Sequence, residues 1–268
     1  MGMSREPKSG LDDNPYIEFR HVCKTFDVEP VLEDVSFEVR RGEMVAVLGR
    51  SGVGKSVTLK HILGFLKPDA GQVFVAGREV SALSEEELMD VRRRVTMVFQ
   101  SGALFDSLTV GENVAYPLRE RALRGMVVSE AEIQQRVDSL LADVELEGMR
   151  DLMPSDLSTG MKRAVAIARA LAADPECILY DEPTTMVDPL MAQTLGDLIL
   201  KLKQKTGLTS VVVTHDVKLA RKLADRAVFL VDSRVAFFGT IAEMDRSTVP
   251  MVQEFIQLDE VSFLGVSR

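Results

Sequence analysis

The chain has 268 residues, of which 46% are apolar and 27% charged, a composition typical of a globular protein with a sizeable core. Its formal net charge of −9, from 32 basic and 41 acidic residues, disfavours a broad electrostatic hold on nucleic acid, so no nucleic-acid partner is expected. No apolar run approaches the roughly 18 residues that span a bilayer, so any membrane association is expected through a partner.

The first residues, 1–14, are polar and are expected to form a mobile tail that is neither a secretory signal nor an anchor. Two cysteines, Cys23 and Cys177, stand far apart, without metal-ligand spacing or a disulfide framework. This cysteine usage favours a reducing, cytoplasmic setting.

Strand-like and helical patterns alternate along the chain, which predicts an α/β fold. Segments 16–22 and 33–39 alternate apolar and polar residues, as half-buried antiparallel strands do. Short continuous apolar runs predict central strands that are covered on both faces, and these lie at 43–49, 177–181 and 210–215. A closing hairpin is expected from 226–231 and 234–239.

The segment GRSGVGKS, Gly49 to Ser56, matches the phosphate-loop pattern G-x-x-x-x-G-K-[ST] between an expected strand and an expected helix. Lys55 is expected to neutralise the β and γ phosphates of a nucleotide, and the Ser56 hydroxyl to bind Mg²⁺. The alternative, a glycine turn followed by a surface lysine, is disfavoured because strand, loop, Lys-Ser pair and helix are all in register. The expected phosphate-binding residues are Gly49, Arg50, Ser51, Gly52, Val53, Gly54, Lys55, Ser56 and Val57.

Between about residues 84 and 173 the pattern turns helical, which suggests a helical insertion on the core. Two capping boxes start helices there, Ser84 with Glu87 and Ser129 with Glu132. Gln100 ends a short apolar run within this region. It could contact Mg²⁺ or water, although alone it is also a plain polar residue.

Residues 156–169, DLSTGMKRAVAIAR, place a Ser-Thr-Gly turn at the start of a helix rich in small apolar residues. Free backbone N–H groups and the helix dipole favour an anion at such a turn. The alternative is a plain serine N-cap on an interior helix. The chain therefore carries two candidate anion-binding turns.

Asp181 and Glu182 come where the apolar run CILYD ends, at the sheet edge where ligands of doubly wound folds bind. Asp181 is expected to hold Mg²⁺ and Glu182 to activate water as a general base. A simple turn cap is the alternative for the pair. His215 ends another strand at that edge and could contact the γ-phosphate or fix Glu182. Asp188 and Pro189 read as N-cap and first residue of the next helix.

Taken in order, these motifs resemble the ATP-binding-cassette (ABC) ATPase family over residues 15–245, followed by a C-terminal tail at 246–268. The resemblance implies a P-loop NTPase core with an antiparallel β subdomain, a helical subdomain at about 84–173, and ATP and Mg²⁺ as ligands. It implies that Glu182, His215 and Gln100 take part in hydrolysis, and that Ser56, Gln100 and Asp181 hold the metal. Phe26 stands where the family stacks an aromatic ring on adenine.

In this family two cassettes pack head to tail, and each ATP lies between one subunit's phosphate loop and its partner's signature turn. The resemblance therefore implies a homodimer with Asp188 at its interface. The signature residues acting on the partner's ATP would be Ser158, Thr159, Gly160 and Met161.

Thr159 and Met161 depart from the family's usual Leu-Ser-Gly-Gly-Gln, and Met186-Val187 replace the common Gly-Leu before Asp188. If the position of Thr159 requires positive φ or a very close approach to phosphate, slower hydrolysis is expected, because threonine adds a Cβ and restricts the backbone.

Met161 and the segment 99–120 resemble the MlaF-type ATPases of Mla/Mce lipid transporters. This resemblance implies a peripheral ATPase on the cytoplasmic face of the inner membrane. It would drive a MlaE-like permease, with an Mce-type substrate-binding protein, and move phospholipids or related hydrophobic molecules. Leu104 and Phe105 are expected either in the groove that receives a coupling helix of the permease or in the core of the helical subdomain.

Three other interpretations stay open from the sequence. One is an ABC ATPase of a different transporter, such as an amino-acid importer. Another is a soluble ABC ATPase of DNA repair or translation, which an acidic chain with a single cassette disfavours. The third is a non-catalytic nucleotide-binding regulator, suggested by Thr159 and disfavoured by Glu182 and His215.

Overall fold

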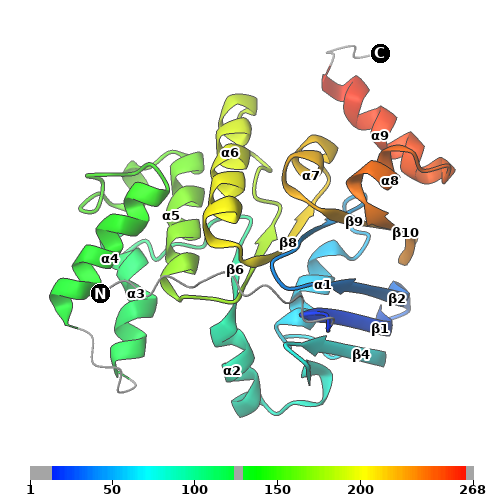
Figure 1. Ribbon diagram of the computed structural model, residues 1–268, viewed down its shortest axis with the longest axis horizontal. Helices are drawn as coiled ribbons and strands as arrows, with labels where there is room; N and C mark the ends of the chain where they lie inside the picture. The colour runs from blue at the N-terminus through cyan, green and yellow to red at the C-terminus, as the bar shows by residue number, and fades with distance from the viewer. Residues whose placement is uncertain (1–13, 124–128, 264–268) are drawn as a thin grey trace.

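The computed structural model describes residues 14–123 and 129–263 (Figure 1). The N-terminal tail predicted at 1–14 thus lies outside the described residues, except for residue 14. The strands are β1 (Ile17–Phe26), β2 (Glu29–Val39), β3 (Met44–Leu48), β4 (Ala70–Val75), β5 (Arg78–Glu79), β6 (Val95–Val98), β7 (Cys177–Asp181), β8 (Thr209–Thr214), β9 (Arg226–Val231) and β10 (Arg234–Thr240).

Helices of different lengths connect and cover these strands. The α-helices are α1 (Lys55–Ile62), α2 (Glu85–Arg94), α3 (Val110–Leu123), α4 (Glu130–Asp143), α5 (Thr159–Ala172), α6 (Pro189–Thr206), α7 (Val217–Leu223), α8 (Ile241–Asp245) and α9 (Pro250–Phe263). Two short 3₁₀ helices are η1 (Val80–Ala82) and η2 (Pro154–Asp156). None of the helices in the described ranges is both long and apolar enough to cross a membrane.

A six-stranded sheet in the order β10-β9-β3-β8-β7-β6 forms the centre of the fold. Strands β9, β3, β8, β7 and β6 are parallel, and β10 pairs antiparallel with β9. Along β8, Val212 faces one hydrophobic core while Val211 and Val213 face the other. Because both faces are covered, β3 and the middle of β8 are continuously apolar. The α/β fold, the central strands and the closing hairpin are confirmed.

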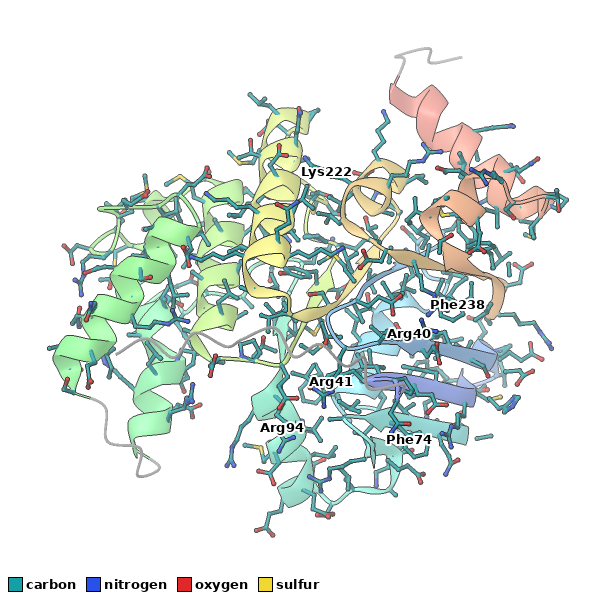
Figure 2. The ribbon with its side chains drawn as sticks, viewed as in Figure 1. Arg40, Arg41, Phe74, Arg94, Lys222 and Phe238 are labelled. Atoms are coloured by element: carbon teal, nitrogen blue, oxygen red, sulfur yellow. The ribbon has the colours of Figure 1, made fainter. Side chains whose placement is uncertain are left out.

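A second, antiparallel sheet in the order β2-β1-β4-β5 packs over α1. Pairing of β1 with β2 confirms the two strands predicted near the N-terminus. Phe19 stacks on Phe37 within this sheet, with 4.5 Å between ring centroids. Phe238 of β10, labelled in Figure 2, packs edge-on against Phe37 with 6.3 Å between ring centroids, where the two sheets come together. Aromatic packing therefore fixes the antiparallel sheet against the central one.

The helices α3, α4 and α5 lie together at the opposite end of the molecule from β1, β2 and β4 (Figure 1). The capping boxes predicted at Ser84 and Ser129 are both present. The interval 84–173 also contains β6, which pairs with β7 at the edge of the central sheet. Four residues of strand are too short a run to stand out between helical patterns.

Helices α6 and α7 cover the face of the central sheet that also carries α5. Lys222 of α7 joins them, since its Nζ donates to the Gln193 carbonyl at 3.2 Å and lies 2.8 Å from Asp197 Oδ1 (Figure 2). Within the C-terminal segment, α9 packs Phe255 edge-on against Phe229 of β9. Cys23 and Cys177 are free thiols.

Candidate functional site

The phosphate loop joins β3 to α1, and glycine is required at two of its positions. Gly49 and Gly54 have φ of 151° and 99°. A Cβ at Gly49 would lie 2.6 Å from the Leu230 carbonyl oxygen, and one at Gly54 would lie 2.6 Å from that of Val31. Any larger residue would push the loop away from its neighbours.

Lys55 is buried at the centre of this loop, with 6% of its surface exposed. Its Nζ donates to the carbonyl oxygens of Gly49 at 2.8 Å and Arg50 at 3.1 Å. It also lies 3.4 Å from Oε1 of Glu182. These contacts hold a positive charge inside the loop, where burial strengthens its attraction for anions.

A cavity of about 310 Å³ opens beside the loop and brings together residues that are distant in sequence. Its lining brings Gln100, Glu182 and His215 together with residues of the phosphate loop. The lining residues are Val31, Ser51, Gly52, Gly54, Lys55, Ser56, Val57, Gln100, Glu182, Thr185 and His215.

Asp181 and Glu182 both face the N-terminal end of α1, although adjacent residues of a strand normally point to opposite sides. The reason is local. Glu182 has φ of +46°, which breaks the strand alternation, and its N–H donates to the Val213 carbonyl at 2.9 Å. Positive φ at a residue other than glycine stores strain, and such strain gathers at functional sites.

Asp181 accepts a hydrogen bond from the Ser56 hydroxyl at 2.9 Å. Burial raises the pKa of Asp181, and the Ser56 hydrogen bond opposes that rise. A hydroxyl and a carboxylate side by side are the hard oxygen ligands that Mg²⁺ prefers, usually with substrate phosphates completing its shell. The two side chains therefore fit a magnesium ion.

Oε2 of Glu182 accepts a hydrogen bond from the Thr185 hydroxyl at 3.0 Å and lies 2.9 Å from Nδ1 of His215. Burial alone would raise the pKa of Glu182. The hydrogen bond with His215, the charges of His215 and Lys55 and the Thr185 hydrogen bond outweigh it and keep the pKa below its ordinary value. The same hydrogen bond raises the pKa of His215. Glu182 is therefore ionised at neutral pH and can accept a proton.

Thr185 and Val31 line the cavity and were not predicted from the sequence. Thr185 follows Glu182 by three residues in a tight turn, closed by its N–H donating to the Glu182 carbonyl at 3.2 Å. The TT dipeptide after the strand was the available signal, since threonine hydroxyls commonly bond to neighbours in turns.

The signature turn lies at the start of α5. Ser158 is the N-cap, and its hydroxyl accepts a hydrogen bond from the Met161 N–H at 3.2 Å. Thr159 begins the helix without positive φ, so the first of the two conditions for slower hydrolysis is not met, while the second, a very close approach to phosphate, stays a prediction. Gly160 is packed against Met191, whose Sδ would lie 2.2 Å from a Cβ placed there. No residue of 157–161 lines the cavity of its own chain.

Asp188 is the N-cap of α6, with its Oδ1 accepting from the Met191 N–H at 3.0 Å and Pro189 at the first helical position. This confirms the capping interpretation. Two large apolar side chains flank it in the solvent, Met186 at 85% exposure and Leu190 at 74%. Such exposed apolar side chains often mark a surface that another protein covers.

Phe26 ends β1 as an exposed residue and is not part of the cavity lining. Nζ of Lys24 lies 5.6 Å from the centre of its ring and pairs with Asp69 at 2.7 Å. The structure thus places Phe26 at the exposed edge of the antiparallel sheet, and its contact with adenine stays a prediction.

A groove of about 430 Å³ lies beside β6, and only one of the two residues predicted to contact a permease, Phe105, lines it. Phe105 lines it with 43% of its surface exposed, and its ring lies 4.8 Å from Tyr116 and 5.5 Å from the Arg169 guanidinium. Leu104 is partly buried and packs on the core instead.

Comparison with known proteins places this site among nucleotide-binding cassettes. The family model described as ABC transporter matches residues 32–185. The chain is 40% identical over 271 aligned residues to the protein TRIGALACTOSYLDIACYLGLYCEROL 3, chloroplastic, of Arabidopsis thaliana, covering 95% of this chain and 77% of that protein. It is 37% identical over 240 residues to the intermembrane phospholipid transport system ATP-binding protein MlaF of Escherichia coli K12, covering 90% and 88%.

A solved structure with the same fold is described as the dimeric structure of a post-hydrolysis state of the ATP-binding cassette MJ0796 bound to ADP and Pi. It superposes with a TM-score of 0.76 and 34% sequence identity, covering 84% of this chain and 98% of that one.

Proposed function

This chain belongs to the ABC transporter family and is an ATPase, and from that premise we propose that it drives a membrane permease that moves phospholipids or related hydrophobic molecules. The observation that carries the ATPase assignment is a single cavity in which the phosphate loop meets the Glu182–His215 pair. The cargo rests on similarity to MlaF, whose name states intermembrane phospholipid transport.

Lys55 and Glu182 would divide the work of hydrolysis. Without nucleotide, Nζ of Lys55 contacts two carbonyl oxygens and Oε1 of Glu182. With ATP bound, Nζ would instead contact the β and γ phosphates. Oε1 would then be free to take a proton from the attacking water, while His215 and Thr185 remain hydrogen-bonded to Oε2. A general base held at one oxygen keeps the other in a fixed direction.

Ser56 and Asp181 would hold Mg²⁺, and Gln100, which lines the cavity, would approach the metal or its water. Bound there, the ion would neutralise charge on the phosphate oxygens. The chain's own part is to keep hydroxyl and carboxylate side by side.

The reaction centre would be shared between two copies of the chain. Ser158 and the first N–H groups of α5 lie outside the cavity of their own chain, at an exposed helix start suited to an anion. In a two-fold homodimer they would complete the partner's site, with Asp188, Met186 and Leu190 at the interface. The dimeric MJ0796 cassette supports this arrangement.

The groove beside β6 would receive a helix of the permease. Phe105 and Tyr116 offer apolar surface, and the guanidinium of Arg169 lies beside them. A MlaE-like permease with an Mce-type substrate-binding protein fits this proposal, and the ATPase would then lie peripherally on the cytoplasmic face of the inner membrane.

Purification of the native membrane complex tests the transport assignment. We expect a permease, an Mce-type subunit and co-purified phospholipid. Recovery of a polar-solute permease with a soluble binding protein would instead favour an importer of amino acids or similar solutes, and would contradict the lipid assignment.

A further inference from the structure

Arg163 is a buried arginine on α5. It is 3% exposed and lies five residues after Ser158. Among the residues that the structure describes, no acidic side chain forms an ion pair with it, and burial lowers its pKa. A buried guanidinium is costly unless other groups bind it, so its hydrogen bonds indicate what it stabilises.

Its hydrogen bonds go to two loops that border the nucleotide cavity. Nη2 donates to the Thr185 carbonyl at 3.1 Å, and Nη1 donates to the Phe99 carbonyl at 3.5 Å. Nε is buried and has no hydrogen-bond partner within residues 14–123 and 129–263. Phe99 directly precedes Gln100, and the Thr185 hydroxyl holds Glu182. One planar group therefore touches the backbone behind both residues.

This arrangement connects three parts of the molecule: the loop after β6, the loop after β7 and α5. The guanidinium is rigid, so its two bonds fix the loop after β6 and the loop after β7 relative to α5. A displacement of either loop breaks a charged hydrogen bond in a buried place unless α5 follows. The start of α5 is the signature turn.

We propose that Arg163 is a positioning residue that couples the state of the nucleotide cavity to the position of the signature turn on the same chain. The proposal deepens the shared reaction centre described above and rests on it. Through Arg163, ATP at one phosphate loop would move the turn that serves the partner's ATP. Nucleotide binding at one site of a dimer would thereby affect the geometry of the other site.

The test compares Arg163→Gln and Arg163→Lys with Arg121→Gln. Arg121 of α3 donates to the carbonyl of Ala173, the C-cap of α5, so its variant also removes a guanidinium–carbonyl bond to an end of this helix, but away from the cavity. For Arg163→Gln we expect kcat to fall at least about 10-fold with the KM for ATP within about 3-fold. Arg163→Lys keeps the positive charge but not the two diverging N–H donors of the guanidinium, so we expect kcat to recover in part.

A second readout separates positioning from simple support of the fold. In the Glu182→Gln background, which suppresses hydrolysis, sedimentation measures ATP-driven dimerisation. Arg163→Gln should need at least about 10-fold more protein to dimerise, while the ATP affinity of the monomer stays unchanged. Values of kcat and dimerisation within 2-fold of Arg121→Gln would overturn the proposal.

Hydrogen exchange on the unmutated chain provides a test that does not depend on a variant that folds. With a non-hydrolysable ATP analogue at protein concentrations below dimerisation, protection around 99–103 and around 158–164 should change at the same nucleotide concentration. A change at 99–103 with none at 158–164 would contradict coupling through Arg163. Failure of the shared site itself would appear separately, as absent complementation between chains with different defects.

Discussion

Nδ1 of His215 lies 2.9 Å from Oε2 of Glu182, so the ends of β8 and β7 are joined by a hydrogen bond between two titratable groups. The bond raises the pKa of His215 and helps to lower that of Glu182. The protonation state of this pair therefore affects both stability and catalysis. The charged hydrogen bond is present between the lowered pKa of Glu182 and the raised pKa of His215.

We expect the ring of His215 to titrate above its ordinary pKa of 6.5 in an NMR titration of the nucleotide-free chain. A raised pKa in the folded state adds stability below pH 6.5, and this contribution is lost as pH rises through the folded-state pKa. The lowered pKa of Glu182 acts in the opposite sense, since its contribution is lost as pH falls through that pKa. Glu182→Gln should bring the His215 pKa down. A His215 pKa that Glu182→Gln leaves unaltered would show that the pair does not interact.

The substitution Glu182→Gln should leave ATP binding intact and reduce turnover by at least about 10²-fold, because it removes a positioned general base. Binding is followed by a fluorescent nucleotide and turnover by phosphate release. Near-normal turnover would remove Glu182 from the role of general base.

Replacing Thr185 by valine removes the hydroxyl that donates to Oε2 of Glu182 and keeps the shape of the side chain. We expect kcat to fall roughly 2- to 10-fold, in line with one hydrogen bond, with little change in KM. Thr185→Ser, which keeps the hydroxyl, is the matched control and should restore most of the rate. Equal rates in the two variants would mean that the hydroxyl does not orient the base.

Phe105→Asp places a charge in the groove beside β6 and should abolish co-purification of the permease. Val28→Asp is the control, because Val28 is exposed and lies outside the groove. Nucleotide binding by both variants checks that they are folded. If Phe105→Asp still recovers the permease from membranes as wild type does, the groove is not the docking site.

Local patterns in the sequence were sufficient for most of the fold. Continuous apolar runs predicted β3, β7 and β8 because strands buried on both faces carry no polar alternation. Each capping box involves groups only three residues apart, so both could be read directly. Short β6 was lost within the helical interval, because pairing with β7 rather than local pattern makes it a strand.

The sequence predicted which residue types form the site, but not the backbone geometry and long-range hydrogen bonds that position them. The phosphate loop and the acidic pair follow from spacing, yet the positive φ of Glu182, which lets both carboxylates face α1, has no signature in the sequence. Arg163 reaches carbonyl groups 64 and 22 residues away, which no local pattern records. Leu104 and Phe105 are neighbours in sequence, and only the structure separates a core residue from a groove residue.

Complementation between two defective chains tests the shared reaction centre most directly. Lys55→Ala disables a chain's own phosphate loop, and Ser158→Glu places a negative charge where the chain would meet its partner's γ-phosphate. Each variant alone should be inactive, whereas a mixture should recover hydrolysis, because a mixed dimer keeps one site with an intact Lys55 and an intact partner Ser158. If no mixing ratio exceeds the more active parent, or if a strictly monomeric form hydrolyses ATP at the full rate, the shared centre is contradicted.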